Sequence, residues 1–308
     1  MENYSIHLPS YSIGDKVYNK IPEICETYGK KIIAIGGHKA INAAREKIEK
    51  AIEGSDLEIL DFPTIASNCS ACTSVSIMYY PDGRFKEPFF YPAPPVHAFI
   101  DTEITVNSPS RYLWAGMGDT YAKYFEAEMS SKGEELQHYF QMGVNASRMC
   151  YEPIMKYGKA AMDSNGRKQN SYEYEQVVLA IIVSTAVASI YLTAEHTVHY
   201  NSGLAHAIFY SLTAHPHIEK NHLHGEVVSY GVLNLLLVDN NMEDFETVYK
   251  FNKSVGLPTC LKDLEFTKDS IEQLAENAVI MKDIQHNPYV ITKEMLITSM
   301  EKLEELNK

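Results

Sequence analysis

The spacing of apolar residues changes once along this chain, and that change limits its fold more than any other feature. Before about residue 105, the apolar run Lys30–Gly37, the amphipathic segment Ala40–Ile52 and the apolar run Leu57–Phe62 follow one another. A strand, a helix and a second strand in succession predict a βαβ unit and a parallel sheet. The same alternation predicts three further elements: a strand at Tyr4–Leu8, a helix at Lys16–Tyr28 and a strand at His97–Ile100.

After about residue 106, long stretches of helical spacing follow one another and few strand signals remain. Eight helices are expected there, at Tyr112–Met129, Glu134–Tyr157, Tyr172–Thr193, Gly203–Thr213, Glu226–Leu237, Phe245–Ser254, Ser270–Met281 and Lys293–Leu306. The sequence therefore predicts an α/β domain over residues 1–105 and an all-helical domain over residues 106–308. Clefts between domains are common ligand sites.

Val177–Ala194 is eighteen residues long and carries no charge, which approaches the lower limit for a membrane span. Its serines and threonines and its lack of basic flanks favour a helix buried inside the helical domain. The first residues show no basic region followed by an apolar one, as a secretory signal would. Five cysteines do not suggest a disulfide framework in a chain of this length. The cytoplasm is the expected location.

Charge limits the classes of partner. The formal net charge is −13, and no cluster of Lys and Arg falls on a predicted face. Nucleic acids and anionic membrane surfaces attract basic proteins, so neither is an expected partner.

The stretch GLAHAIFYSLTAHPHIEKNHLHGE holds five of the twelve histidines. His206 lies on an apolar helix, where a satisfied core histidine is the alternative to a metal ligand, and His224 begins a helix. A catalytic divalent metal commonly has three protein ligands and one open position. The best carboxylate candidate is Asp119 in LWAGMGDTYAKYFEA, where two glycines permit a tight backbone. From spacing alone, a helix N-cap is the simpler explanation of Asp119, and a metal ligand is the alternative.

Two weaker motifs lie nearer the N-terminus. Gly36 and Gly37 end a predicted strand and precede a helix, where backbone amides can face a phosphate, although GGHKA lacks the G-x-G-x-x-G pattern. Cys69 and Cys72 form a single C-x-x-C without a thioredoxin-like context. Since Cys69 follows the loop PTIASN, we expect it to line a pocket.

Together these pieces resemble one family. GG-x-K-A, PTIAS, AGMGD, AHAI and HGE-x-V-x-YG occur in this order in the iron-containing alcohol dehydrogenases, most closely in their glycerol dehydrogenase-like branch. The resemblance extends to GLPTCLKDL near the C-terminus. It implies the fold shared with dehydroquinate synthase: a Rossmann-like domain followed by a helical metal-binding domain.

The resemblance also implies site residues. One divalent metal would be held by Asp119, His206 and His224. The iron-using branch has another histidine four residues after the aspartate, where this chain has Lys123. That departure favours zinc over iron, since two imidazoles and a carboxylate with an open position suit zinc.

In the family the N-terminal domain binds NAD(H) or NADP(H). Thr64 and Ser67 match positions that contact this coenzyme, and Gly36 and Gly37 match the loop near its adenosine half. The implied reaction is hydride transfer between the nicotinamide and a small alcohol or carbonyl, with the metal lowering the pKa of the substrate hydroxyl. The resemblance further implies a homo-oligomer built on dimers.

Two departures from the family matter. Cys69 stands where glycerol dehydrogenases have a substrate-binding aspartate, which favours a 2-oxo acid over glycerol, as in the hydroxycarboxylate dehydrogenases of the branch. The motif G-G-G-K-x-x-D before PTIAS is missing, with roughly 50–60 residues that would form two small βα units. The parallel sheet is therefore expected to be incomplete. The missing motif leaves one alternative, a metal-binding family member that has lost its coenzyme. A second alternative is a dehydroquinate synthase-like lyase, since that family shares the architecture.

Overall fold

A short parallel sheet forms the N-terminal part of the computed structural model, which describes residues 5–26, 60–79 and 85–308. Strand β5 (His97–Ile100) lies between β1 (Tyr11–Ile13) and β2 (Leu60–Asp61), and both neighbours run parallel to it. All four residues of β5 are buried, as is usual for a parallel strand covered on both faces. The predicted parallel sheet is thus confirmed, as are its strands at His97–Ile100 and, in part, at Leu57–Phe62.

The first predicted strand was placed too early. Residues 5–8 form no strand, and the pairing strand begins at Tyr11. The hydroxyls of Ser10 and Ser12 bond to the two ring nitrogens of His97, at 2.8 and 3.0 Å, and so fix β1 beside β5 just beyond Pro9. Within Lys16–Tyr28, a 3₁₀ turn (Val17–Lys20) leads into α1 (Ile21–Cys25). The elements expected at residues 30–37 and 40–52 lie outside the described residues.

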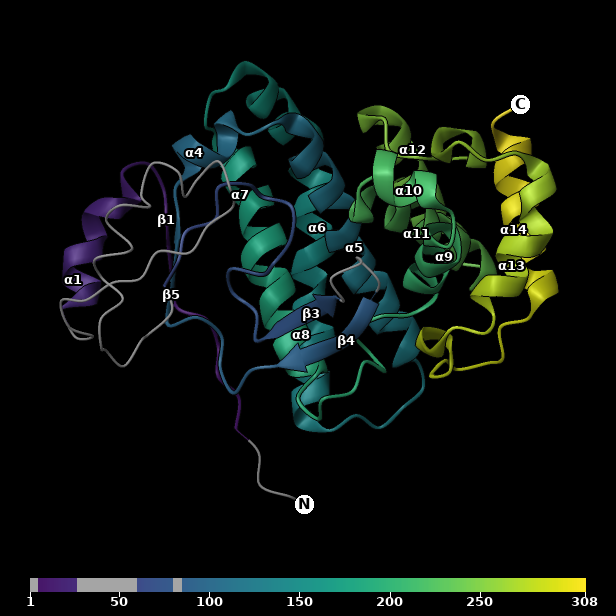
Figure 1. Ribbon diagram of the computed structural model, residues 1–308, viewed down its shortest axis with the longest axis horizontal. Coiled ribbons are helices and arrows are strands. Elements are labelled where there is room, and N and C mark those ends of the chain that lie inside the picture. The colour runs from purple at the N-terminus through teal and green to yellow at the C-terminus, as the bar shows by residue number, and fades with distance from the viewer. Residues whose placement is uncertain (1–4, 27–59, 80–84) are drawn as a thin grey trace.

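An antiparallel hairpin, β3 (Val75–Tyr79) and β4 (Phe85–Phe90), was not expected from the sequence. Pro88 lies within β4 and pairs with Ile77 in the register. Proline donates no backbone hydrogen bond and is tolerated on sheet edges, and each strand of a two-stranded ribbon is an edge. The prolines therefore concealed a strand without preventing it. Figure 1 shows the hairpin beside α8.

Helices make up the rest of the chain, and each of the eight expected helices is present. The helices are α4 (Thr102–Asn107), α5 (Ser110–Ser130), α6 (His138–Arg167), α7 (Tyr172–Leu179), α8 (Thr185–Leu192), α9 (Leu204–Thr213), α10 (Pro216–Asn221), α11 (His224–Val238), α12 (Met242–Val255), α13 (Ile271–Ala278) and α14 (Lys293–Leu306). A π-helical segment, Ala180–Ser184, joins α7 to α8. The short helices α4 and α10 were not expected.

Figure 1 shows β1 and β5 at one end of the molecule, α5 to α8 in the middle and α9 to α14 at the other end. Helix α5 packs against α6 and α11, and α11 packs against α9. The segment Tyr172–Leu192 is long and apolar enough to cross a membrane, but 67% of its most apolar window is buried in protein. Such burial is typical of the central helix of a helical domain.

Candidate metal and coenzyme site

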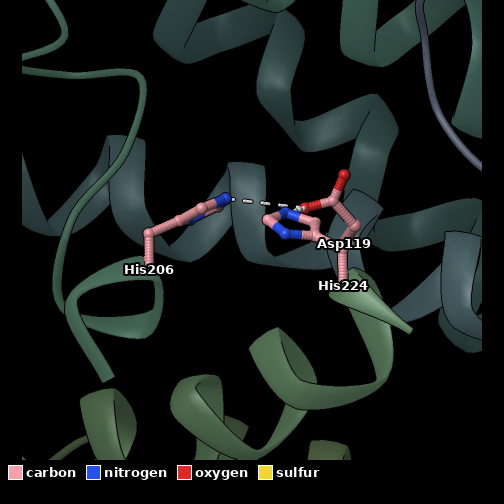
Figure 2. Close-up of side chains that lie close together, drawn as sticks. All are labelled: Asp119, His206 and His224. Carbon is pink, nitrogen blue, oxygen red and sulfur yellow. Dashed lines mark ion pairs between the residues drawn. The ribbon is translucent and has the colours of Figure 1, made fainter. Parts of the chain in front are cut away.

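Three side chains from three helices point toward one another (Figure 2): Asp119 from α5, His206 from α9 and His224 from the first turn of α11. The Asp119 Oδ1 atom lies 3.2 Å from His224 Nε2 and 3.6 Å from His206 Nε2. One potential ligand atom from each residue lies within 4.8 Å of the other two, and no other such group occurs in the part of the chain that the structure describes. The arrangement matches the expected ligand set, and metal binding itself remains a prediction.

Glycines bring these helices close enough for the three side chains to meet. A Cβ atom on Gly225 would lie 2.0 Å from the Ala115 carbonyl oxygen, and one on Gly118 would lie 2.2 Å from the Gly225 carbonyl oxygen. Helices α5 and α11 therefore touch through their backbones, beside Asp119 and His224. Likewise, a Cβ on Gly231 would lie 2.4 Å from the Ala205 carbonyl oxygen, which sets α9 against α11. Only glycine fits such approaches.

Glu126 orients His206, and it was not identified from the sequence. Its side chain is fully buried, and Oε2 lies 2.7 Å from His206 Nδ1. Its other oxygen accepts hydrogen bonds from the backbone amides of Gly203 and His206, at 2.8 and 2.9 Å. A carboxylate in this position favours the tautomer that carries its proton on Nδ1 and leaves the Nε2 lone pair directed at Asp119. This is the usual support of a metal-binding histidine, so the residues present fit a metal.

The charges of the group depend on one another. Burial raises the pKa of Asp119, but the adjacent His224 and His206 more than offset this and lower it. For Glu126 burial again raises the pKa, and His206 reverses the direction. Burial lowers the pKa of His206, but Glu126 and Asp119 raise it above its usual value. Both carboxyls are thus held ionised, as metal binding requires.

The start of α11 is fixed by a second acidic residue. Glu226 Oε1 lies 2.7 Å from His222 Nδ1, and Oε2 accepts a hydrogen bond from the Leu223 amide at 3.0 Å. These contacts hold the turn that presents His224. His215 and His217 instead pack against Phe266, at ring-centroid distances of 5.0 and 4.8 Å, away from the ligand group.

The loop between β2 and β3 brings the predicted coenzyme and substrate positions to α5. A Cβ on Gly116 would lie 2.8 Å from the Ala66 carbonyl oxygen and 2.9 Å from Ser67 Cα, so the loop rests directly on α5. Ser67 is partly buried and Thr64 is exposed. Burial and the nearby Asp119 raise the pKa of Cys69 to about 11, so its thiol is neutral. Gly36 and Gly37 lie outside the described residues.

Lys123 occupies the position where the iron-using branch has a histidine. Its side chain is buried, and its ammonium donates to the backbone carbonyl oxygen and to the side-chain oxygen of Asn201, the latter at 3.0 Å. Asn201 lies in the connection between α8 and α9. The structure thus places a buried positive charge one helical turn from Asp119.

Comparison with known proteins agrees with this architecture. No family model matches the chain. Glycerol dehydrogenase of Thermotoga maritima is 32% identical over 292 residues, which cover 91% of this chain and 76% of the relative. Hydroxycarboxylate dehydrogenase A of Escherichia coli is 27% identical over 281 residues, covering 89% and 74%.

Solved structures share the fold. The crystal structure of glycerol dehydrogenase from Schizosaccharomyces pombe superposes with a TM-score of 0.81 at 20% identity, covering 99% of this chain and 91% of the other. Structures of iron-containing alcohol dehydrogenases are also similar. The chain therefore belongs to the glycerol dehydrogenase branch of the iron-containing alcohol dehydrogenase family and is an NAD-dependent alcohol dehydrogenase.

Proposed function

We propose that this enzyme transfers hydride between a nicotinamide and a small alcohol or carbonyl beside a divalent metal held by Asp119, His206 and His224. The observation that carries the proposal is the convergence of these three side chains, together with the buried Glu126 that directs His206. Two imidazoles and one carboxylate favour zinc, with iron as the alternative. We further propose that the molecule works in the cytoplasm as a dimer-based homo-oligomer, with residues 1–105 and 106–308 as its two domains.

The chain's own residues position the reactants. Glu126 keeps a proton on His206 Nδ1, and this leaves Nε2 as a ligand atom. When bound, the metal supplies Lewis-acid polarisation of the substrate oxygen and the nicotinamide supplies the hydride chemistry. Thr64 and Ser67 lie on the loop that rests against α5, which suits contact with a coenzyme whose nicotinamide must approach Asp119. Gly36, Gly37 and the adjacent His38 and Lys39 are the positions proposed to contact the adenosine half of NAD(H) or NADP(H).

A 2-oxo acid, reduced to a 2-hydroxy acid, is the substrate we propose. Cys69 is neutral and offers no carboxylate to bind a polyol hydroxyl, and a neutral thiol tolerates an anionic substrate. The similarity to a hydroxycarboxylate dehydrogenase supports this assignment. Glycerol is the second candidate, because the relative that is 32% identical is a glycerol dehydrogenase.

The test compares the two substrate classes on one preparation of zinc-loaded protein. We expect NADH to be oxidised with 2-oxobutyrate or 2-oxoglutarate, and NAD to be reduced only slowly with glycerol. Efficient turnover of glycerol with no reaction of either 2-oxo acid would refute the substrate assignment and leave the dehydrogenase assignment intact.

Coenzyme binding is tested separately, because the missing glycine motif leaves the pyrophosphate without its expected contacts. NADH titrated into the zinc-loaded protein is expected to quench protein fluorescence saturably. A protein that retains zinc without binding NADH or NADPH would have lost its redox partner, which is the alternative of a metal-binding family member without catalysis. The comparisons favour a dehydrogenase over the dehydroquinate synthase-like lyase.

A further inference from the structure

Lys123 is a buried cation on the helix that also carries Asp119 and Glu126. Its side chain is 7% exposed, and it lies on α5 between Asp119, four residues before it, and Glu126, three residues after it. Lysine is almost never fully buried unless it is paired, because removing an ammonium from water is costly. A partner for this charge is therefore expected.

The hydrogen bonds of the ammonium go to neutral groups. Both of its hydrogen bonds go to oxygens of Asn201. Among ion pairs between described residues, none includes Lys123 at 4.0 Å or less. An ammonium has three donors, so one N–H remains available for a further acceptor.

The ammonium also interacts electrostatically with the proposed ligand and substrate positions. It favours the ionised forms of Asp119 and Glu126, and it opposes the rise in the pKa of the Cys69 thiol that burial causes. Cys69 is the residue that replaces the polyol-binding aspartate. Lys123 thus acts electrostatically on both Asp119 and Cys69, the proposed substrate-binding position.

The sum of charges favours an anionic ligand. Asp119 and Glu126 contribute two negative charges, and Lys123 contributes one positive charge. With a divalent cation, the buried group has a net charge of about +1. A carbonyl substrate with one carboxylate would neutralise it, whereas a neutral carbonyl compound would leave it charged in a site of low dielectric.

We propose that Lys123 binds the carboxylate of a 2-oxo acid substrate and determines the preference of this enzyme for anionic over neutral carbonyl compounds. The inference rests on the proposed function, since it concerns the substrate of the same site. Lys123 then completes its third hydrogen bond with the substrate, while Asn201 fixes the position of the ammonium.

The experiment compares 2-oxobutyrate with 1-hydroxy-2-butanone, in which a neutral hydroxymethyl group replaces the carboxylate. Lys123→Met removes the charge, Lys123→Gln keeps a donor for Asn201, and Lys123→Arg keeps the charge. Lys132→Met serves as the matched control, because Lys132 follows the same helix, is exposed and pairs with Asp239. We expect both neutral variants to lower the ratio of kcat/KM for the acid to that for the hydroxyketone about 10–100-fold, mainly through KM. Lys123→Arg should restore much of the ratio.

A second measurement does not depend on turnover. Oxamate, a carboxylate analogue of 2-oxo acids, is titrated calorimetrically into zinc-loaded wild type and into each variant, with zinc content measured in parallel. The proposal expects weaker oxamate binding in the two neutral variants at unchanged zinc content. Equal losses for both substrates, or unchanged oxamate affinity, would show that Lys123 serves only to hold Asn201 and would overturn the proposal.

Two further outcomes also test the proposal. If the neutral variants do not fold, the test is the substrate preference of the wild-type enzyme, and equal kcat/KM values for 2-oxobutyrate and 1-hydroxy-2-butanone contradict the proposal. If wild type oxidises NADH with neither substrate, the proposed substrate class fails. Oxamate binding would then still test Lys123 by itself.

Discussion

Replacing Glu126 by glutamine should weaken zinc binding although Glu126 is not one of the three proposed ligands. Its carboxylate accepts three hydrogen bonds, two from backbone amides and one from His206 Nδ1 at 2.7 Å. Glutamine has one acceptor oxygen. If that oxygen serves the two amides, the new NH₂ group faces Nδ1 and favours the tautomer with its proton on Nε2, the atom that should bind the metal. If the amide is reversed, its NH₂ group faces the backbone N–H donors of Gly203 and His206 in a buried site.

Loss of such a supporting partner commonly costs 10–100-fold in metal affinity, which is about 1.4–2.8 kcal/mol. We expect the Glu126→Gln variant to fall in this range. The assay is competition for zinc between the protein and a chromophoric chelator at neutral pH. Glu128→Gln is the matched control, because Glu128 lies on the same helix and is exposed. Zinc affinities of the two variants that agree within about twofold would refute the orienting role of Glu126.

Three further predictions follow from the same site. Gly225→Ala should lower the free energy of unfolding, measured with urea, by at least about 1–3 kcal/mol, because the new Cβ would lie 2.0 Å from the Ala115 carbonyl oxygen. Gly166→Ala is the control: its Cβ would meet nothing within 4 Å, so the same measurement should show it to be neutral or slightly stabilising. Asp119→Ala should sharply reduce zinc content measured by elemental analysis, whereas His215→Ala should not, and equal losses would contradict the ligand assignment. The lowered pKa of Asp119 means that its stabilising contribution is present above the unfolded pKa of about 4 and is lost as the pH falls through the folded value. In metal-free protein, the stability advantage of wild type over Asp119→Asn should therefore change little above about pH 5 and shrink as the pH falls below about 4.

The sequence predicted most of the helical part and less of the sheet, for different reasons. Helical spacing persists over many residues, so each of the eight long helices was found, with differences at their ends. The short helix α10 (Pro216–Asn221) offered too few residues for a periodic signal. Strand β1 depends on His97, 85 residues away from Ser12, and no local pattern reveals such a partner. The hairpin was hidden because Pro88 counts against a strand unless its edge position is known.

Site residues that belong to local sequence motifs could be predicted. Residues whose role depends on contacts between distant parts of the chain could not. Asp119, His206 and His224 were assigned through a resemblance, yet the structure gives the glycines beside them a physical reason: α5 and α11 can meet at Asp119 only if Gly118 and Gly225 have no side chains. Glu126 could have been found from the sequence. It follows Asp119 by seven residues, which is about two helical turns, so both carboxylates lie on one face of the helix. An acidic residue on the buried face of an apolar helix requires a partner. The same reasoning applies to Lys123 on that helix, whose hydrogen bonds within the described residues go only to Asn201. Because the hydrogen-bond partners of this buried ammonium are neutral, the search for a contact with the substrate carboxylate should begin at Lys123.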